Sequence, residues 1–492
     1  MEPETYEKTK VCQLLVTFWP LLLGNVLEWY DFGVYSFLAP NMKDIFFHSS
    51  SVSAWAGYAV TFVLRPFGGL INGWLADRYG RRVAVLTSII GMLTATFGQG
   101  LLPTFICCGD SWGTVGLVLL LILRALQGLS VGGELGPIVS YFAETAPPNR
   151  ILAATGLLHS SAGLGFLSAN LLVVLVVHVV GPEGMVMWGW RIPFLVSLVP
   201  GSIALWGRSK LAESTDFARL VMERCEDHMN SQSIAKDCAR QRPRLKDHWR
   251  AVLIGFLSTC SPGVSYYSAL WCPSYLKSNG LDQTSALLAS CLFTCIAMAS
   301  WLVLPFLNDV CCRIDPITIT LAGSIGVALV SFPLFYLLST SDNLRVMSVV
   351  VLGSYGVAAG IASSHLSVFV ADLFPINLRA LGFGMSFNVA MAFVGGSTPL
   401  VNAAILETEW TLGVGLYWSL MGGVTSLAAA WGVYCRRSGN LPSYLLGHRE
   451  EHAKSFKVAD EACPGDTLEF EPCSNNLSLS WDATTNVYRS NS

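Results

Sequence analysis

The chain has 492 residues and a net charge of −3, and only 13% of its residues are charged, about half the roughly 25% of soluble domains. This composition excludes a soluble globular protein and predicts an integral membrane protein; the net charge by itself says nothing about nucleic acid. The fourteen cysteines lie mostly in apolar runs or adjacent pairs, so we expect small core side chains rather than a disulfide framework.

Stretches of about 20 apolar residues, the length that crosses a bilayer as a helix, recur twelve times. They are 13–38, 54–76, 83–102, 115–142, 151–180, 190–207, 250–273, 284–307, 316–339, 346–371, 380–405 and 410–435. We predict an all-α integral membrane protein with twelve transmembrane helices in two six-helix bundles. The predicted domains are an N-terminal bundle (1–207), a middle loop (208–249), a C-terminal bundle (250–435) and a tail (436–492) expected to be disordered.

Positive charge is distributed unequally between the two sets of connecting segments. With the N-terminus in the cytoplasm, the inside segments hold 24 Lys and Arg residues and the outside segments hold 4. Cytoplasmic segments carry the excess of positive charge in membrane proteins. The sequence therefore predicts a multi-pass protein of the cell membrane with both termini and the middle loop in the cytoplasm. No small-residue cleavage site follows the first apolar stretch, which we interpret as a retained span.

The first span contains two acids, Glu28 and Asp31, which are three residues apart and share a helix face. A carboxylate at the middle of a membrane helix costs at least ~2.5 kcal/mol and usually serves a substrate or proton pathway. Arg124 of the fourth span falls at nearly the same depth, so we expect an Asp31–Arg124 ion pair that releases Arg124 when Asp31 is protonated. The alternative is a buried pair that neighbouring groups satisfy and that has no transport role.

The second span contributes Arg65, which either binds a substrate carboxylate or pairs with a buried acid. In the fourth span, Gln127 follows Arg124 by one turn, and Glu134 is a further buried acid suited equally to a proton relay or a structural hydrogen bond. Glycines four residues apart, Gly128, Gly132 and Gly136, predict close helix packing. Weaker cavity candidates are Tyr266, Tyr267, His365 and Asn388.

Charged motifs in the predicted cytoplasmic loops repeat between the two halves. Asp77 and Arg81 follow the second span, and Asp309 and Arg313 follow the eighth with the same spacing. We interpret these loops as a conformational latch, because a loop carboxylate can sit at the N-terminus of a facing helix; a simple positive-inside anchor is compatible with that role. The assigned latch residues are Gly73, Asp77, Arg78, Gly80, Arg81, Arg82, Glu144, Arg150, Asp309, Arg313, Asp372 and Arg379.

These motifs together resemble a known family. The segment 73–82 and the six-plus-six layout resemble the major facilitator superfamily, and Asn25-x-x-Glu28-Trp29-Tyr30-Asp31-Phe32 resembles the first-helix signature of its metabolite:proton symporter family. That family includes permeases for 2-oxoglutarate, citrate, shikimate, and proline with betaine. The loop 308–313 lacks the glycine and paired basic residues common there, and the tail lacks heptads, so we expect no coiled-coil osmotic gating.

The resemblance implies a proton-coupled symporter that imports a small carboxylate-bearing metabolite by alternating access. We place a 2-oxoglutarate-like acid first, because arginine grips a carboxylate with two parallel hydrogen bonds, and a proline- or betaine-type zwitterion second. An exchanger or uniporter of the same fold, or a transport-dead membrane sensor, is also compatible with these motifs. The sequence shows no nucleotide fingerprint, metal cluster or catalytic triad, so we predict no enzyme activity, no cofactor and no metal. The expected partners are the substrate, protons and the lipid bilayer, with no nucleic acid.

Overall fold

The computed structural model describes residues 11–79, 81–132, 135–147, 149–209, 245–375, 378–408, 410–446, 478–482 and 487–491. The chain divides into two units, residues 1–447 and 448–492. Within the described residues of the first unit, all regular structure is helical. In the second, β1 (Ser478–Asp482) pairs antiparallel with β2 (Val487–Asn491).

The N-terminal half of the first unit covers the first six predicted spans. Its helices are α1 (Val11–Phe46), α2 (Ser51–Tyr79), α3 (Arg81–Gln99), α4 (Phe105–Val131), α5 (Leu135–Thr145), α6 (Ile151–Gly184), the π-helix η2 (Met185–Gly189), α7 (Arg191–Val196) and α8 (Leu198–Ser209). Two glycines with a φ of 74°, Gly109 and Gly181, interrupt α4 and α6. Only glycine adopts this backbone conformation without strain, and Pro182 follows the second break.

The C-terminal half of the first unit covers the last six predicted spans. It consists of the 3₁₀-helix η3 (Leu245–His248), α11 (Trp249–Ser278), α12 (Gln283–Leu307), the π-helix η4 (Asn308–Cys312), α13 (Pro316–Thr340), α14 (Leu344–Ser364), α15 (Leu366–Asp372), α16 (Arg379–Phe383), the π-helices η5 (Gly384–Asn388) and η6 (Met391–Gly395), α17 (Thr398–Glu407) and α18 (Leu412–Arg437). Side-chain caps define several starts: Asp282 accepts from Ser285 N–H, Asn343 from Val346 N–H, and Asp315 precedes Pro316 at the first turn of α13.

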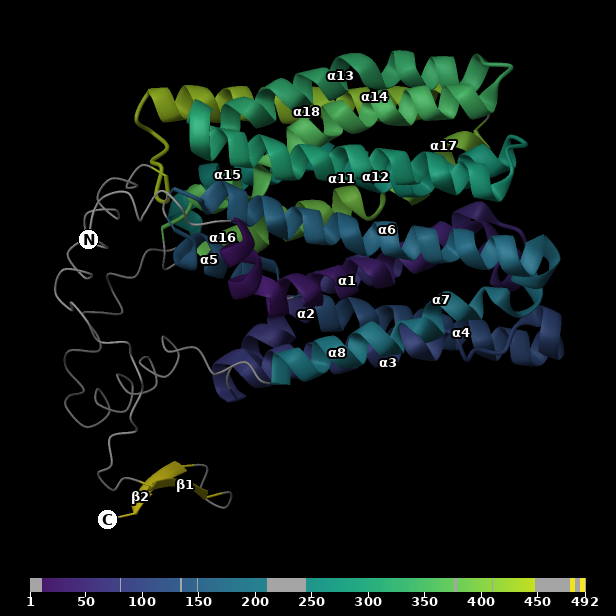
Figure 1. Ribbon diagram of the computed structural model, residues 1–492, viewed down its shortest axis with the longest axis horizontal. Coiled ribbons are helices and arrows are strands. Elements are labelled where there is room, and N and C mark those ends of the chain that lie inside the picture. Colours follow the sequence, from purple (N-terminus) through teal and green to yellow (C-terminus); the bar gives the residue numbers. More distant parts are fainter. Residues whose placement is uncertain are drawn as a thin grey trace. The chain divides into compact units, whose positions relative to one another are not determined.

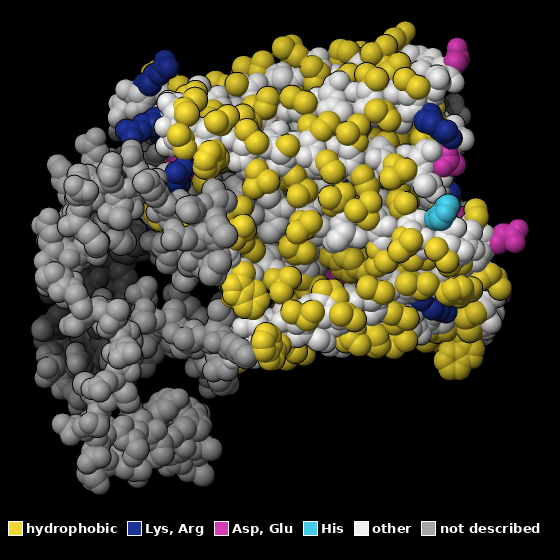
Figure 2. Space-filling model, viewed as in Figure 1, with side chains coloured by type: hydrophobic (Ala, Val, Ile, Leu, Met, Phe, Trp, Pro, Cys, Tyr) yellow, Lys and Arg dark blue, Asp and Glu magenta, His cyan; other side chains and the backbone are white. Residues whose placement is uncertain are grey.

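All twelve predicted spans are helical in the part of the chain that the structure describes. Eight helical segments there are long and apolar enough to cross a membrane. Figure 1 shows the long helices running side by side. On the face in Figure 2, apolar side chains cover the middle of the helices and charged ones gather toward the ends. Leu70, Val179 and Leu427 are each nearly three-quarters exposed, as lipid-facing side chains are.

Helix pairs pack tightly within each half, and one pair, α6 with α12, packs about as tightly across the two halves. In the N-terminal half α1 packs on α6 and α2 on α4; in the C-terminal half α13 packs on α18 and α12 on α14. The halves meet where α6 lies against α12 and α1 against α11. A Cβ at Gly128 or Gly132 would overlap the carbonyl of Thr61 or Arg65, so these glycines let α4 approach the backbone of α2, as predicted.

The expectations for the tail and the cysteines need correction. Residues 438–446, assigned to a disordered tail, pack against the end of α15, where the carboxylate of Asp372 binds them. Cys107 and Cys108, expected to be thiols, are joined by a disulfide. The other described cysteines are free thiols: Cys260, Cys272, Cys291 and Cys435 are buried, as expected of core residues, whereas Cys295, Cys311 and Cys312 are exposed.

Candidate functional site

Five charged side chains of the N-terminal half are buried: Glu28, Asp31, Arg65 and Arg124 in mid-helix, and Arg208 near the end of α8. Arg65 on α2 forms an ion pair with Glu28 on α1, with 3.5 Å between Nη2 and Oε1. Its guanidinium also lies over the rings of Phe32 (4.3 Å to the centroid) and Phe62 (4.8 Å). Of the two roles considered for Arg65, the structure shows the pairing with a buried acid. The aromatic faces add cation–π attraction to that pair.

Arg124 and Asp31 do not form the expected ion pair. Arg124 on α4 instead donates to Gln127 Oε1 (2.8 Å), one turn along the same helix, and to the Tyr58 carbonyl (3.4 Å). Its guanidinium lies 4.2 Å from the centroid of the Tyr35 ring. The expected pair is replaced by a bond within α4, because Gln127 lies one turn from Arg124 on the same helix surface.

Asp31 is joined to Arg124 indirectly. Neither of its carboxylate oxygens has a hydrogen-bond partner within the described residues, although the Thr96 hydroxyl of α3 lies beside it. Gln127 Nε2 donates to that hydroxyl (3.3 Å) and Gln127 Oε1 accepts from Arg124. An amide and a hydroxyl therefore lie between the carboxylate and the guanidinium. The printed hydrogen bonds run from Arg124 through Gln127 to Thr96 and end beside Asp31.

A vestibule of about 560 Å³ lies between the halves at one end of the bundle. The ends of α1, α11 and α17 and the start of α2 line it, with Trp55 and Trp271 among the lining side chains. Further along these helices Phe62 of α2 meets Tyr267 of α11, with 5.1 Å between ring centroids. This aromatic contact crosses from one half to the other.

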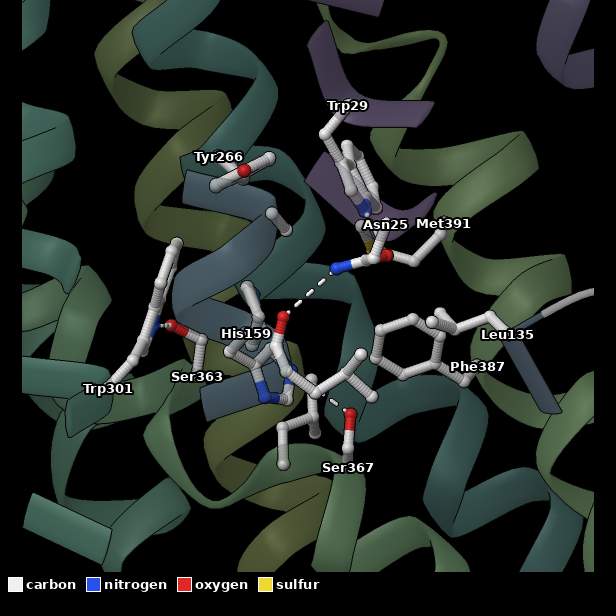
Figure 3. Close-up of a pocket in the computed structure, with 14 residues that line it drawn as sticks. Asn25, Trp29, Leu135, His159, Tyr266, Trp301, Ser363, Ser367, Phe387 and Met391 are labelled. Atoms are coloured by element: carbon white, nitrogen blue, oxygen red, sulfur yellow. Dashed lines mark hydrogen bonds between the residues drawn. The ribbon is translucent and has the colours of Figure 1, made fainter. Parts of the chain in front are cut away.

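A smaller cavity of about 60 Å³ lies beyond that aromatic contact (Figure 3). Both halves line it, through Asn25, Trp29, Leu135, Leu158, His159, Ala162, Pro262, Tyr266, Trp301, Ser363, Leu366, Ser367, Phe387 and Met391. His159 Nε2 of α6 and Ser367 Oγ of α15 form a hydrogen bond of 3.0 Å across the halves. Side chains from both halves thus enclose this cavity.

The weaker candidates differ in their positions. Tyr266 lines the cavity, and Tyr267 belongs to the aromatic contact beside it. His365 is buried with Nδ1 at 2.8 Å from Ser364 Oγ, and Asn388 ends η5; neither is among the residues that line the cavity. Glu134 lies outside the described residues.

At the end opposite the vestibule, a carboxylate joins the two halves. Asp309 Oδ2 of η4 accepts from the backbone N–H of Ala153 in the first turn of α6 (2.8 Å). A carboxylate at a helix N-terminus is stabilised by free N–H groups and by the helix dipole. This is the geometry predicted for the latch loops, here made by the C-terminal copy. Arg150 lies over the Phe306 ring (5.2 Å), and Arg313 is exposed with a φ of 46°.

The N-terminal latch is not described in the same detail. Gly80 lies outside the described residues, as do the side chains of Asp77, Arg78, Arg81, Arg82 and Glu144, together with the surroundings of Gly73. Its role stays a prediction. Arg379 is buried at the start of α16, facing the same end as Asp309.

Asp372, also assigned to the latch, binds the segment that follows α18. Its carboxylate accepts from Arg436 Nη2 (2.7 Å), Ser443 Oγ (2.8 Å) and the backbone N–H groups of Leu445 (2.7 Å) and Leu446 (2.9 Å). Arg436 bridges to Asp315 at 2.7 Å. A fully buried carboxylate with several donors is a strong anchor, and it explains why residues 438–446 pack on the bundle.

Sequence reasoning missed several residues of the site. Thr96, Tyr35 and Tyr58 surround the buried charges, and Trp301 lines the cavity. Trp301 stands in an uninterrupted apolar run, where nothing distinguishes a cavity ring from a core ring. Thr96 could have been predicted as a site residue, since its hydroxyl lies in mid-span and can form a hydrogen bond with a buried polar group.

Comparison with known proteins defines the family. Residues 21–399 match the model of the Major Facilitator Superfamily, and the chain belongs to this superfamily of membrane transporters; it is a transporter, not an enzyme. The "Ectoine/proline transporter ProP" of Corynebacterium glutamicum is 30% identical over 403 residues, which cover 78% of this chain and 77% of that protein. The "Proline/betaine transporter" of Escherichia coli K12 is 30% identical, covering 85% and 83%.

Solved structures show the same fold at lower identity. The D-xylose-proton symporter superposes with a TM-score of 0.65 at 17% identity, covering 85% of this chain and 97% of that one. The human organic anion transporter MFSD10 gives 0.56 at 17%, covering 87% and 100%. The predicted fold and the resemblance to the metabolite:proton symporters are confirmed; the two relatives are named as transporters of ectoine, proline and betaine, not of 2-oxoglutarate.

Proposed function

We propose that the chain is a proton-coupled symporter that carries a small zwitterion of the proline and betaine type by alternating access. The names of its relatives support this substrate class. The positive-inside distribution of Lys and Arg favours cytoplasmic termini, so the vestibule would open to the outside and the Asp309 contact would close the cytoplasmic end.

The observation that carries the proposal is the carboxylate of Asp31, which lacks a hydrogen-bond partner in the described part of the chain yet lies in the interior of a membrane bundle. Keeping an unpaired carboxylate there is expensive, and protonation relieves the cost. A site that must gain and lose a proton as the bundle opens and closes is what coupling to a proton gradient requires.

The ion pair of Arg65 is one reason to rank a dicarboxylate below a zwitterion. Glu28 compensates the charge of Arg65, whereas the partners of Arg124, Gln127 and the Tyr58 carbonyl, are neutral and leave its charge in place. A dianion would therefore find only one uncompensated positive charge beside Glu28 and Asp31 for its two carboxylates. A zwitterion carries its own compensating cation and makes no such demand.

Uptake into proteoliposomes with an imposed pH gradient tests the proposal. We expect labelled proline or glycine betaine to accumulate when the outside is acidic, with protons entering alongside, and 2-oxoglutarate to compete poorly. Accumulation of 2-oxoglutarate without zwitterion uptake would restore the organic-acid assignment. Proline transport without proton entry would make the protein an exchanger or uniporter.

A further inference from the structure

The small cavity has an unusual lining for a site that would accept a zwitterion. Rings of Trp29, Tyr266, Trp301 and Phe387 border it, but none of the described side chains that line it is Asp, Glu, Lys or Arg (Figure 3). The buried acids lie elsewhere, with Glu28 paired to Arg65. A cation in this cavity would therefore meet aromatic rings and no carboxylate.

Three of these rings form a concave group, which we call the aromatic cage (Trp29, Tyr266 and Trp301). The Tyr266 centroid is 5.7 Å from each indole ring, at interplanar angles of 87° to Trp29 and 45° to Trp301. The rings come from α1, α11 and α12, so both halves of the bundle contribute.

Hydrogen bonds at their edges hold both indoles in place. Trp29 Nε1 donates to Asn25 Oδ1 (3.1 Å), and Trp301 Nε1 donates to Ser363 Oγ (2.8 Å). With the N–H groups engaged, the ring faces are what the tryptophans can offer a ligand; the Arg65 guanidinium lies 5.7 Å from the Trp29 centroid, so Trp301 and Tyr266 are the rings of the cage that no protein cation already contacts among the described residues. Rings fixed in advance lose little entropy when a ligand binds.

The chemistry of such faces selects one kind of cargo. A cation above an aromatic face is attracted by the ring quadrupole, and desolvation strengthens the attraction. A quaternary ammonium has no N–H to donate, so it loses no hydrogen bond in an apolar cavity. By the measure that a water needs ~10–15 Å³, the cavity of about 60 Å³ takes roughly four to six water-sized groups, the scale of a trimethylammonium head.

We propose that the aromatic cage binds the ammonium head of the substrate by cation–π contact and favours a quaternary over a secondary ammonium. This proposal rests on the proposed zwitterion transport and identifies the side chains that bind the cationic end of the zwitterion. The carboxylate end lies toward Ser367, which Figure 3 shows on the opposite side of the space from Trp29 and Tyr266 and which already bonds His159. Glu28 and Asp31 are then not needed to bind the ammonium head and remain available for proton coupling.

A matched pair of competitors tests the cage. Glycine betaine and tert-butylacetate have the same shape, but a neutral carbon replaces the nitrogen in the second. In proteoliposomes of the full chain, we expect glycine betaine to inhibit labelled proline uptake at much lower concentration than tert-butylacetate. Trp301→Leu should shrink this preference by roughly 2- to 30-fold, the range of a cation–π contact, and Trp301→Phe, which keeps a ring, should retain most of it.

Two further variants separate the ring from its surroundings. Ser363→Ala removes the acceptor of the Trp301 indole and keeps the ring, so it should weaken both competitors alike. Trp112→Leu alters an exposed tryptophan of α4 and should change neither. If Trp301→Leu does not reach the membrane, Tyr266→Leu against Tyr266→Phe provides the same comparison.

The outcomes distinguish the cage from the transport proposal. Equal loss of both competitors in Trp301→Leu, or an unchanged preference, would overturn the cage while zwitterion transport stands. A wild-type protein that takes up proline but does not distinguish glycine betaine from tert-butylacetate would do the same. If the wild-type protein neither transports proline nor binds glycine betaine, the proposed function fails first and the cage with it.

Discussion

The two halves of the bundle carry charge at different depths. The N-terminal half buries Glu28, Asp31, Arg65 and Arg124 well inside its helices. The helices of the C-terminal half carry their charged residues only near their ends, as Lys277, Asp309, Asp372 and Arg436 illustrate. Charges at helix ends either reach water or lipid headgroups or, like the buried Asp372, are held by several local donors, whereas charges at mid-membrane need a function to justify them.

The interior of the C-terminal half is polar without being charged. Tyr355 donates to Ser265 Oγ (2.9 Å), and Asn402 accepts from Trp418 Nε1 (3.2 Å). The comparison indicates that the two halves have different roles. The N-terminal half supplies the ionisable groups for proton coupling, and the C-terminal half supplies neutral polar groups and aromatic ring faces. If this is correct, a change of charge alters coupling in the first half and only stability or conformational equilibrium in the second.

Asp31→Asn should produce the largest effect on transport. The variant cannot exchange a proton, so we expect it to lose accumulation of proline against a gradient while keeping counterflow, which needs no net proton movement. Uptake driven by an imposed pH gradient, alongside counterflow in the same vesicles, measures both. Asp342→Asn, an exposed acid of the C-terminal half, is the control and should behave as the wild type. Accumulation and pH dependence like those of the wild type in Asp31→Asn would remove this residue from the coupling mechanism.

Replacing only one member of the Glu28–Arg65 pair should lower the stability of the protein more than any other variant considered. Glu28→Gln or Arg65→Gln leaves an uncompensated buried charge, for which the cost is about 3–5 kcal/mol, whereas the double variant removes both charges together. We expect each single variant to unfold at a clearly lower temperature in detergent and the double variant to recover part of the loss. Additive losses in this double-mutant cycle would contradict a direct interaction between the two side chains.

Asp309→Asn should act on the equilibrium between states. A hydrogen bond to a charged group is worth about 1.5–3 kcal/mol, so weakening the contact with Ala153 N–H should favour opening at that end roughly 10-fold or more. Labelling of a cysteine placed at Ser51, in the vestibule of a cysteine-depleted protein, should slow as the vestibule closes more often. Asp247→Asn, an exposed acid on η3, is the control. Unchanged labelling with weaker substrate binding would contradict a latch role.

Long apolar stretches made the helices predictable, but their ends were not. The fourth span was expected from 115, whereas α4 begins at Phe105 with Thr104 as its cap, breaks at Gly109 and starts again at Asp110. Hydropathy detects what crosses the bilayer, whereas the cap and the tertiary contacts decide where a helix starts.

Some features of the candidate site could likewise be predicted from the sequence and others could not. Charges in mid-span stand out in any sequence, so Glu28, Asp31, Arg65 and Arg124 were found, whereas Arg208, which was assigned to the middle loop, is buried at the end of α8. Which of them pair depends on helix rotation and side-chain reach, and Gln127 displaced Asp31 as the partner of Arg124 for that reason. The aromatic cage depends on rings from three helices that meet only in the folded bundle, so the sequence offers no periodic pattern that would reveal it.

Asp282 should show the smallest effect, because it is a charge at a helix end of the C-terminal half. It caps α12 by accepting from Ser285 N–H (2.9 Å) and pairs with Arg345 (3.0 Å) at the surface. Asp282→Ala should cost about 0.5–2 kcal/mol of stability through the lost cap, and Asp282→Asn less, since an exposed ion pair contributes only about 0–1 kcal/mol.

The pH dependence of this small effect has a definite sign. The Ser285 N–H, with Arg345 adding to it, holds the pKa of Asp282 below its usual range. The charge therefore stabilises the folded state above the unfolded-state pKa of about 3.9, and this contribution is lost as the pH falls through the lower folded-state value. Melting temperatures of wild type and Asp282→Asn should differ slightly at neutral pH and converge in acid. Because Asp282 lies at a helix end, substrate selectivity should not change; if it did, the division of charge between the two halves would be wrong.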